Sequence, residues 1–202
     1  MKIYITRHGT TEWNISRRLQ GWKDSNLTKE GIKNAISLGK RLASIDFDVI
    51  YSSPQNRAVE TAKLIRAKRD IPIVNHKALR EMRYGIWEGM TLDDIDKNYP
   101  EEFHNYVNNP DAYIPVDGET YNDLFKRVDD FLEEIIEKDD RNILVVTHGI
   151  PIKAIIAKIK GLSIEEFAKI PIYTGTSLHI FEVKDGRIHI VVEDDISHLE
   201  SI

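Results

Sequence analysis

Residues Ile3-Tyr4-Ile5-Thr6-Arg7-His8-Gly9 form an apolar run that ends in a histidine followed by a glycine, and Ile143-Leu144-Val145-Val146-Thr147-His148-Gly149 repeats this pattern. Short continuous runs of β-branched and aromatic residues are typical of fully buried strands in parallel sheets. In open α/β sheets the ligand site lies beyond the carboxyl ends of such strands. The sequence therefore predicts a sheet that presents two imidazoles and an arginine at its functional edge.

Length and composition narrow the class of protein. With 202 residues, 41% hydrophobic and 30% charged, the chain resembles an ordinary soluble globular protein, and we expect one domain over residues 1–202. Zero cysteines exclude disulfides, thiolate metal sites and cysteine nucleophiles. The net charge of −5, with no block of cations, argues against a nucleic-acid partner.

Hydropathy argues against a membrane partner. No apolar stretch approaches the roughly 18 residues of a membrane span, and the first strand leaves no room for a signal peptide. A cytoplasmic location is therefore the default expectation. The sequence leaves open whether the chain forms a homodimer.

Strand and helix patterns alternate along the rest of the chain. Thr28 is expected to cap a helix whose apolar positions include Ile32 and Ile36, and Ser53-Pro54 is expected to open a helix over residues 55–68. The other expected elements are strands at 49–51 and 72–74, helices at 121–135 and 151–161, and a closing hairpin of 177–183 and 187–192. This order predicts an α/β fold with a mostly parallel central sheet covered by helices on both faces, a three-layer α/β/α arrangement.

Residues 91–120 interrupt this alternation. Their pattern is irregular and contains prolines at 100, 110 and 115, which is typical of a small helical insertion or lid. Between Gly85 and Phe125 the only cation is Lys97, against ten acidic residues. We expect such an acidic lid to disfavour substrates with several negative charges.

Polar side chains gather at the predicted strand ends. Arg7-His8, Arg57 and His148 each follow a strand, and Arg57 falls in the first turn of its helix. Its guanidinium and the helix N-terminus could therefore act on one anion. Two arginines, two imidazoles and free backbone amides predict a site for a tetrahedral anion, of which phosphate is the natural example.

The histidines add chemistry to this binding site. An imidazole among cations can attack phosphorus and form a phosphohistidine, and the second imidazole would stabilise charge on the transferring group. A leaving alkoxide also needs a proton, for which Glu81 is the leading candidate, although its position does not follow from periodicity.

Several motifs, in order along nearly the whole chain, resemble the histidine phosphatase superfamily, also called phosphoglycerate mutase-like. They are Arg7-His8-Gly9-Thr10-Thr11-Glu12-Trp13-Asn14, Gln20-Gly21-Trp22, Leu27-Thr28 with Gly31, Ser52-Ser53-Pro54 with Arg57 and Thr61-Ala62, Glu81 with Gly85 and Trp87-Glu88-Gly89, Gly118-Glu119-Thr120, and Val146-Thr147-His148-Gly149.

The resemblance implies a role for each matching residue. His8 would be the phosphorylated nucleophile and Glu81 the proton donor and acceptor, with Arg7, Arg57 and His148 around the phosphate. Asn14 and Gln20-Gly21 would be further phosphate contacts, and Gly149 of the last motif would also bind the substrate. The resemblance implies no metal and no cofactor, and a small phosphomonoester as the substrate.

Three other classes of protein are less consistent with these residues. A metallohydrolase could use His8, His148 and a carboxylate, but two fixed arginines would repel a divalent metal. A phosphate-binding module without turnover would not need every expected catalytic residue. Asp94-Ile95-Asp96 suggests a haloacid dehalogenase, but it lies in a helical pattern rather than at a strand end.

Within the superfamily, the choice is between a phosphatase and a cofactor-dependent phosphoglycerate mutase. Met82 follows Glu81 where mutases usually place arginine, and the acidic lid also favours a phosphatase. A broad small-molecule phosphatase, an α-ribazole-phosphate phosphatase and a phosphoserine phosphatase remain open. Whether Tyr84 or His198 contributes also remains open, and the other histidines (His76, His104, His179, His189) are expected to be structural or exposed. All three tryptophans (Trp13, Trp22, Trp87) fall within motifs assigned to the phosphate pocket.

Overall fold

The computed structural model describes residues 1–199 and contains one mixed sheet of six strands in the order β3-β2-β4-β1-β5-β6. The strands are β1 (Lys2–Arg7), β2 (Val49–Ser52), β3 (Ile73–Asn75), β4 (Asn142–Thr147), β5 (Leu178–Lys184) and β6 (Arg187–Asp195). The first four are mutually parallel. Strand β5 runs antiparallel to β1, and β6 runs antiparallel to β5, so these two strands form the closing hairpin. Both apolar runs form central neighbouring strands, so the predicted fold class is confirmed.

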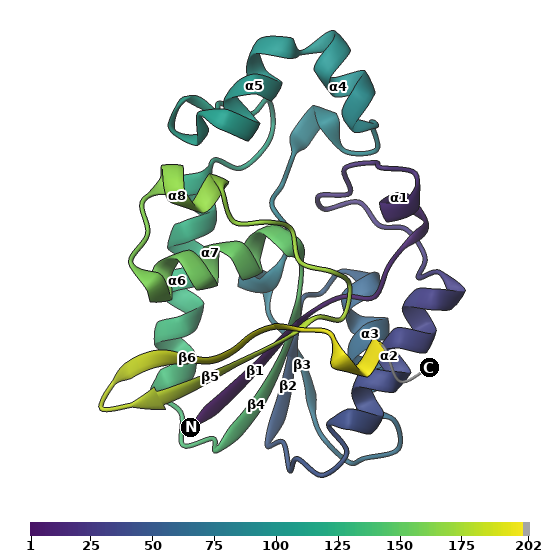
Figure 1. Ribbon diagram of the computed structural model, residues 1–202, viewed down its shortest axis with the longest axis vertical. Coiled ribbons are helices and arrows are strands. Elements are labelled where there is room, and N and C mark those ends of the chain that lie inside the picture. The colour runs from purple at the N-terminus through teal and green to yellow at the C-terminus, as the bar shows by residue number, and fades with distance from the viewer. Residues whose placement is uncertain (200–202) are drawn as a thin grey trace.

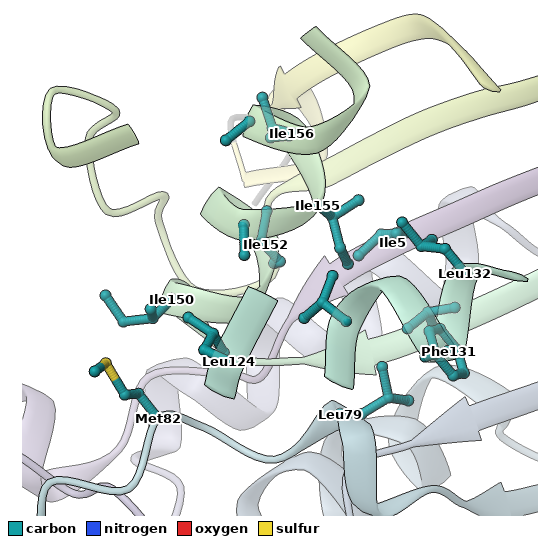
Figure 2. Close-up of a cluster of buried hydrophobic side chains, with 14 of the residues drawn as sticks. Ile5, Leu79, Met82, Leu124, Phe131, Leu132, Ile150, Ile152, Ile155 and Ile156 are labelled. Atoms are coloured by element: carbon teal, nitrogen blue, oxygen red, sulfur yellow. The ribbon is translucent and has the colours of Figure 1, made fainter. Parts of the chain in front are cut away.

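The helices lie in two layers on opposite faces of the sheet (Figure 1). One layer contains α2 (Lys29–Arg41) and α3 (Asn56–Arg66), and the other contains α6 (Tyr121–Ile136) and α7 (Gly149–Lys160). Side chains of β1 alternate between these layers, with Ile3 and Ile5 in the core beneath α6 and α7 and Tyr4 in the core beneath α2 and α3. Figure 2 shows the first core, in which Ile5 meets Leu132 of α6 and Ile155 of α7.

The insertion (residues 91–120) stands apart from the sheet at the end where β1 and β4 finish (Figure 1). It contains α4 (Leu92–Asn98), α5 (Pro100–Asn108) and the short 3-10 helix η3 (Pro110–Ala112), and Thr91 caps α4. Gly85 stands at its base with φ +59°, and a Cβ there would overlap the backbone of Val116 and Asp117. The remaining helical elements are α1 (Glu12–Ile15), α8 (Ile164–Ala168), η1 (Lys77–Leu79), η2 (Gly85–Trp87) and η4 (Ser197–Leu199).

Three expectations about helices are wrong in detail. Helix α3 begins at Asn56 with Gln55 as its N-cap, rather than being capped by Ser53. Helix α7 begins at Gly149, so Pro151 lies within its first turn. Ile32 and Ile36 of α2 are exposed, because this helix buries a face that includes Gly31, Ala35, Leu38 and Gly39.

None of the helices formed by residues 1–199 combines the length and the apolar character needed to cross a membrane.

Candidate active site

A pocket of about 380 Å³ opens between the strand ends and the insertion. Residues Arg7 and His8 enter it from the end of β1, and Gly149 enters it from the start of α7. The other lining residues are Trp13, Asn14, Arg17, Arg18, Leu19, Gln20, Arg57, Glu81, Tyr84, Leu92, Phe103, Tyr106, Val107, Ile150 and Ile172. The structure therefore brings together seven of the nine predicted site residues in one lining.

His8 is held as a neutral imidazole. Its Nδ1 lies 2.8 Å from the carbonyl oxygen of Gly9, which assigns the proton to Nδ1. Its Nε2 then accepts a hydrogen bond from Nε of Arg57 at 3.3 Å. Burial, followed by the cations of Arg57 and Arg7, holds the pKa of His8 well below its ordinary value. Nε2 is therefore unprotonated at neutral pH, and it could attack an electrophile that displaces the long hydrogen bond from Arg57.

His148 lies directly behind His8. The two ring centroids are 5.1 Å apart, and Nε2 of His148 lies 2.7 Å from the hydroxyl of Ser53. Its buried Nδ1 has no hydrogen-bond partner among residues 1–199. Burial and the nearby charge of Arg57 lower the pKa of His148 well below its usual range. His148 is absent from the pocket lining because its ring is fully buried.

The two arginines differ in how many donors they keep free. Nη1 of Arg7 donates to the carbonyl of Tyr173 at 2.7 Å, whereas its buried Nε has no hydrogen-bond partner in the described chain. Arg57 uses four of its five N–H groups, on His8, Gly21, Lys23 and Asp24. Arg7 is therefore the arginine with an edge free for a bidentate contact to phosphate.

Asp24 occupies the N-terminus of α3. Its Oδ1 lies 3.0 Å from Nη1 of Arg57, and its two carboxylate oxygens accept hydrogen bonds from the backbone N–H groups of Asn56 and Arg57. The anion shared by Arg57 and this helix end is thus Asp24, and the expectation that both act together on a ligand is wrong for these two amides.

Glu81 is fixed with one carboxyl oxygen free. Its Oε1 accepts hydrogen bonds from the backbone N–H groups of Met82 at 2.9 Å and Ile150 at 3.3 Å, and Oε2 bonds to none of residues 1–199. Burial raises the pKa of Glu81, against the opposing effects of the Met82 hydrogen bond and the cations Arg57, Arg7 and Arg127. A proton on this carboxyl group therefore belongs on Oε2, since Oε1 already faces two donors.

The remaining predicted phosphate contacts fall into two groups. Asn14 accepts two hydrogen bonds at Oδ1 from Thr11, so its amide nitrogen is free to donate into the pocket. Gln20 lines the pocket, but both ends of its amide bind other side chains, those of Thr11 and Ser25. Gly21 lies outside the lining, and its carbonyl accepts from Arg57 at 2.9 Å.

The insertion contributes an apolar and aromatic wall. Its lining residues are Leu92, Phe103, Tyr106 and Val107, and none of its acidic side chains lines the pocket. The acidic side chains of the insertion therefore lie outside the pocket lining, and the expectation that the acidic lid disfavours substrates with several negative charges stays a prediction. Arg17 and Arg18 even add two cations to the lining, although Arg18 donates to the carbonyl of Gly89 at 2.7 Å.

The tryptophans are placed differently from one another. Only Trp13 lines the pocket among the three. Trp22 is 41% exposed and donates from Nε1 to the carbonyl of Glu81 at 3.0 Å. Trp87 packs among aromatic rings near the insertion, including Tyr99, Phe103, Tyr106 and Tyr113.

Two residues left open by the sequence have separate outcomes. Tyr84 lines the pocket, and its hydroxyl lies 3.2 Å from that of Tyr106. His198 does not line it, and instead lies beside α2, where its carbonyl accepts from Ser37. Of the histidines expected to be structural or exposed, His76 places Nε2 3.1 Å from Oε2 of Glu134, within hydrogen-bond distance.

Sequence reasoning missed Asp24, Gln55 and Arg127, and it named Ser53 only as part of a motif, without its contact to His148. Gln55 accepts the backbone N–H of Glu81 at 2.9 Å, and Arg127 donates to the carbonyl of Glu81 at 3.2 Å. The only signal was their proximity in sequence to the motifs, which gives no hint of these contacts.

The site contains no obvious metal-ligand set. Among residues 1–199, no group of three or more His, Asp or Glu side chains is arranged to hold a metal ion. Arg7 and Arg57 beside the imidazoles would repel a divalent cation.

Comparison with known proteins gives a consistent match over the chain. The family model described as the histidine phosphatase superfamily (branch 1) matches residues 3–195. Phosphoserine phosphatase 1 of Hydrogenobacter thermophilus is 32% identical over 168 residues, which are 83% of this chain and 80% of the relative. The 2,3-bisphosphoglycerate-dependent phosphoglycerate mutase of Bartonella bacilliformis is 33% identical over 184 residues, which are 87% of this chain and 89% of the relative.

Solved structures with the same fold include Bacillus stearothermophilus YhfR, with 40% identity, a TM-score of 0.94 and 98% of each chain covered. The alpha-ribazole phosphatase from Shigella flexneri has 26% identity and a TM-score of 0.90, with 97% of each chain covered.

Proposed function

The chain belongs to the histidine phosphatase superfamily, whose matched relatives include phosphatases and mutases, and from this premise we propose that it is a metal-independent phosphomonoesterase that acts on small phosphorylated metabolites through a phosphohistidine. The observation that carries the proposal is the pair of hydrogen bonds made by the ring of His8, from which its tautomer is assigned. Its Nδ1 is bound to the carbonyl of Gly9, so the unprotonated Nε2 is the atom that faces Arg57.

In the first step, Nε2 of His8 attacks phosphorus while the bond from phosphorus to the ester oxygen breaks. The proton on Oε2 of Glu81 moves to the departing alkoxide, which leaves as an alcohol. The free edge of Arg7, the buried Nδ1 of His148 and the amide nitrogen of Asn14 supply donors for the phosphoryl oxygens.

In the second step, water attacks the phosphorus of the phosphohistidine. The ionised carboxyl group of Glu81 takes a proton from this water, and the phosphorus–nitrogen bond breaks. Inorganic phosphate leaves, and both His8 and Glu81 return to their starting protonation states. We also propose that the insertion (residues 91–120) acts as a lid over the leaving group, because it supplies one wall of the pocket.

A phosphoglycerate mutase is the second candidate. Relatives of that activity and the pocket cations Arg17 and Arg18 favour it. Against it, three of the four residues that form the wall (Leu92, Phe103 and Val107) have no side-chain donor for the second anionic group of a bisphosphorylated cofactor, and the hydroxyl of the fourth, Tyr106, is already hydrogen-bonded to Tyr84. Met82, expected to matter for this choice, is fully buried in the core and supplies no charge to the pocket (Figure 2).

The decisive experiment combines turnover with trapping of the intermediate. The purified protein is assayed for phosphate release on a panel of phosphomonoesters in the presence of chelator, and quenched at alkaline pH to preserve a phosphohistidine. We expect phosphate release and a protein that carries a phosphoryl group, and we expect this group to be absent from His8→Ala. With 3-phosphoglycerate and 2,3-bisphosphoglycerate, isomerisation faster than hydrolysis would instead establish the mutase.

A further inference from the structure

Glu81 is the one proposed catalytic group that does not stand at a strand end. It follows η1 on a segment without regular secondary structure, between Arg80 and Tyr84. A general acid must stay within hydrogen-bond reach of the ester oxygen, and a displacement of about 1 Å can reduce turnover about 10²-fold. Something other than the sheet must therefore hold this segment in place.

Arg127 of α6 supplies much of that hold. Its Nη2 donates to the carbonyl of Glu81 at 3.2 Å, and its Nη1 donates to the carbonyl of Ala78. The same guanidinium forms a fork with Glu119, through Nε at 2.6 Å and Nη2 at 2.9 Å. Both side chains are largely buried, at 18% and 11% exposed, so solvent screens the pair only weakly.

Glu119 forms hydrogen bonds to Arg83, at the other end of the segment that carries Glu81. Its Oε2 accepts the backbone N–H of Arg83 at 3.2 Å, and its own backbone N–H donates to the carbonyl of Arg83 at 2.8 Å. The pair formed by Glu119 and Arg127, named here the bracket, thus contacts residues 78, 81 and 83. Glu119 is also the penultimate residue of the insertion, so the bracket joins the insertion to the segment that carries Glu81.

We propose that Arg127 is a positioning residue which, together with Glu119, fixes the backbone of Glu81 so that Oε2 faces the leaving group. The proposal rests on the proposed function, and it assigns a role to the Gly118-Glu119-Thr120 motif that the phosphate site itself does not use. Trp22 also holds this segment, because its Nε1 donates a hydrogen bond to the carbonyl of Glu81.

The leaving group of the substrate tests this role. Alkyl phosphates need a proton from Glu81 in the first step, whereas aryl phosphates with acidic leaving groups need it much less. In Arg127→Met we expect kcat for alkyl phosphates to fall about 10- to 100-fold and kcat for aryl phosphates to fall less than about threefold. Arg127→Lys should recover only part of the loss, because one ammonium group cannot replace the fork.

Arg69 offers a matched control. It also donates to several backbone carbonyl groups, those of Leu42, Ile45, Ile65 and Arg66, but it touches no residue of the pocket. Arg69→Met therefore removes a comparable set of hydrogen bonds. We expect any loss of activity in Arg69→Met to be equal for alkyl and aryl substrates.

A second readout does not depend on turnover. The band of the protonated Glu81 carboxyl group in the infrared spectrum is identified by its absence in Glu81→Gln. Its intensity, followed as a function of pH, gives the pKa of that group. Removing the cation of Arg127 should raise this pKa further, while Arg69→Met should leave it unchanged. The other groups that act electrostatically with Glu81 are the cations Arg7, Arg57 and Lys153 and the hydroxyls of Tyr84, Tyr106 and Tyr121.

The outcomes separate this inference from the proposed function. Equal losses for alkyl and aryl substrates in Arg127→Met, or an unchanged Glu81 carboxyl band, would overturn the positioning role even if the protein is a phosphatase. Full activity in His8→Ala would instead overturn the proposed function, and the infrared result would still decide the bracket. If Arg127→Met does not fold, Glu119→Gln tests the same leaving-group contrast.

Discussion

The two ends of the pocket are built in opposite ways. At the catalytic end, where β1 and β4 finish beside the segment that carries Glu81, the side chains of His8, Arg57 and Glu81 each have hydrogen bonds to other residues, so their polar atoms point in fixed directions. At the insertion, Leu92, Phe103 and Val107 offer apolar surface and no hydrogen-bonding side chain. From this difference we expect the chemistry and the choice of substrate to reside in separate parts of the molecule.

The largest effect should come from the fixed end. His8→Ala removes the proposed nucleophile, and we expect kcat to fall by at least about 10⁴-fold for every substrate. Wild-type activity should persist in chelator. Loss of activity in chelator with recovery on adding a divalent ion would favour a metal mechanism.

Glu81→Gln tests the same end through proton transfer. The amide cannot donate a titratable proton, so alkyl phosphates should lose about 10²- to 10⁴-fold in kcat, with a smaller loss for aryl phosphates in the phosphorylation step. Binding of vanadate should be preserved, which serves as the control for folding. Equal losses in the phosphorylation step for both leaving groups would show that Glu81 is not the acid.

Arg57→Ala separates binding from chemistry. We expect vanadate, a mimic of the transferring phosphoryl group, to bind about 10- to 100-fold more weakly, because a charge-assisted hydrogen bond contributes about 1.5–3 kcal/mol. Intrinsic fluorescence corrected for vanadate absorbance provides the measurement. Trp13→Phe should abolish most of the signal and Trp87→Phe should not, since only Trp13 of these two lines the pocket.

The pH dependence of kcat/KM should reflect the pKa values of His8 and Glu81. The pKa of His8 is well below 6.5, so its neutral form persists into acidic solution, and activity should fall only below that pKa. The pKa of Glu81 is raised above 4.5, and its protonated form is lost as the pH rises through that value. For alkyl phosphates, kcat/KM should therefore decline about tenfold per pH unit on the alkaline side, and this decline should be absent in Glu81→Gln.

The smallest effect should come from the insertion. Phe103→Ala removes an aromatic side chain from the wall, and KM for a naphthyl phosphate should rise about two- to tenfold, since aromatic contacts contribute about 0.5–1.5 kcal/mol. KM for glycerol phosphate should hardly change. Phe125→Ala, which removes a ring that packs on Phe167 outside the pocket, is the matched control. A uniform change for both substrates would contradict the division between the two ends.

The same division explains what the sequence could predict. Buried parallel strands leave a continuous apolar run, so β1 and β4 and the polar residues that follow them were predictable from local pattern. Contacts between distant segments leave no such pattern. Helix α3 starts later than expected because its first amides are capped by Asp24, a side chain more than 30 residues earlier in the chain.

The insertion shows the limit of charge counting. Its eight acidic residues are visible in the sequence, but which of its side chains face the pocket depends on how α4 and α5 dock. Trp87 was likewise assigned to the phosphate pocket by its motif, yet it packs against aromatic rings supplied by the insertion. The bracket could not be predicted at all, because Arg127 reaches carbonyl groups some 46 and 49 residues away.

Asp24 has a consequence for product release. Its carboxylate lies 3.0 Å from the guanidinium of Arg57, a group that the family resemblance implies to lie around the phosphate. A site with unopposed cations would retain inorganic phosphate after each cycle, and binding the product as tightly as the transition state gives no gain in rate. Because Asp24 already occupies part of Arg57, we expect it to lower the affinity of the pocket for inorganic phosphate, so the carboxylate that caps α3 would also favour release of the product.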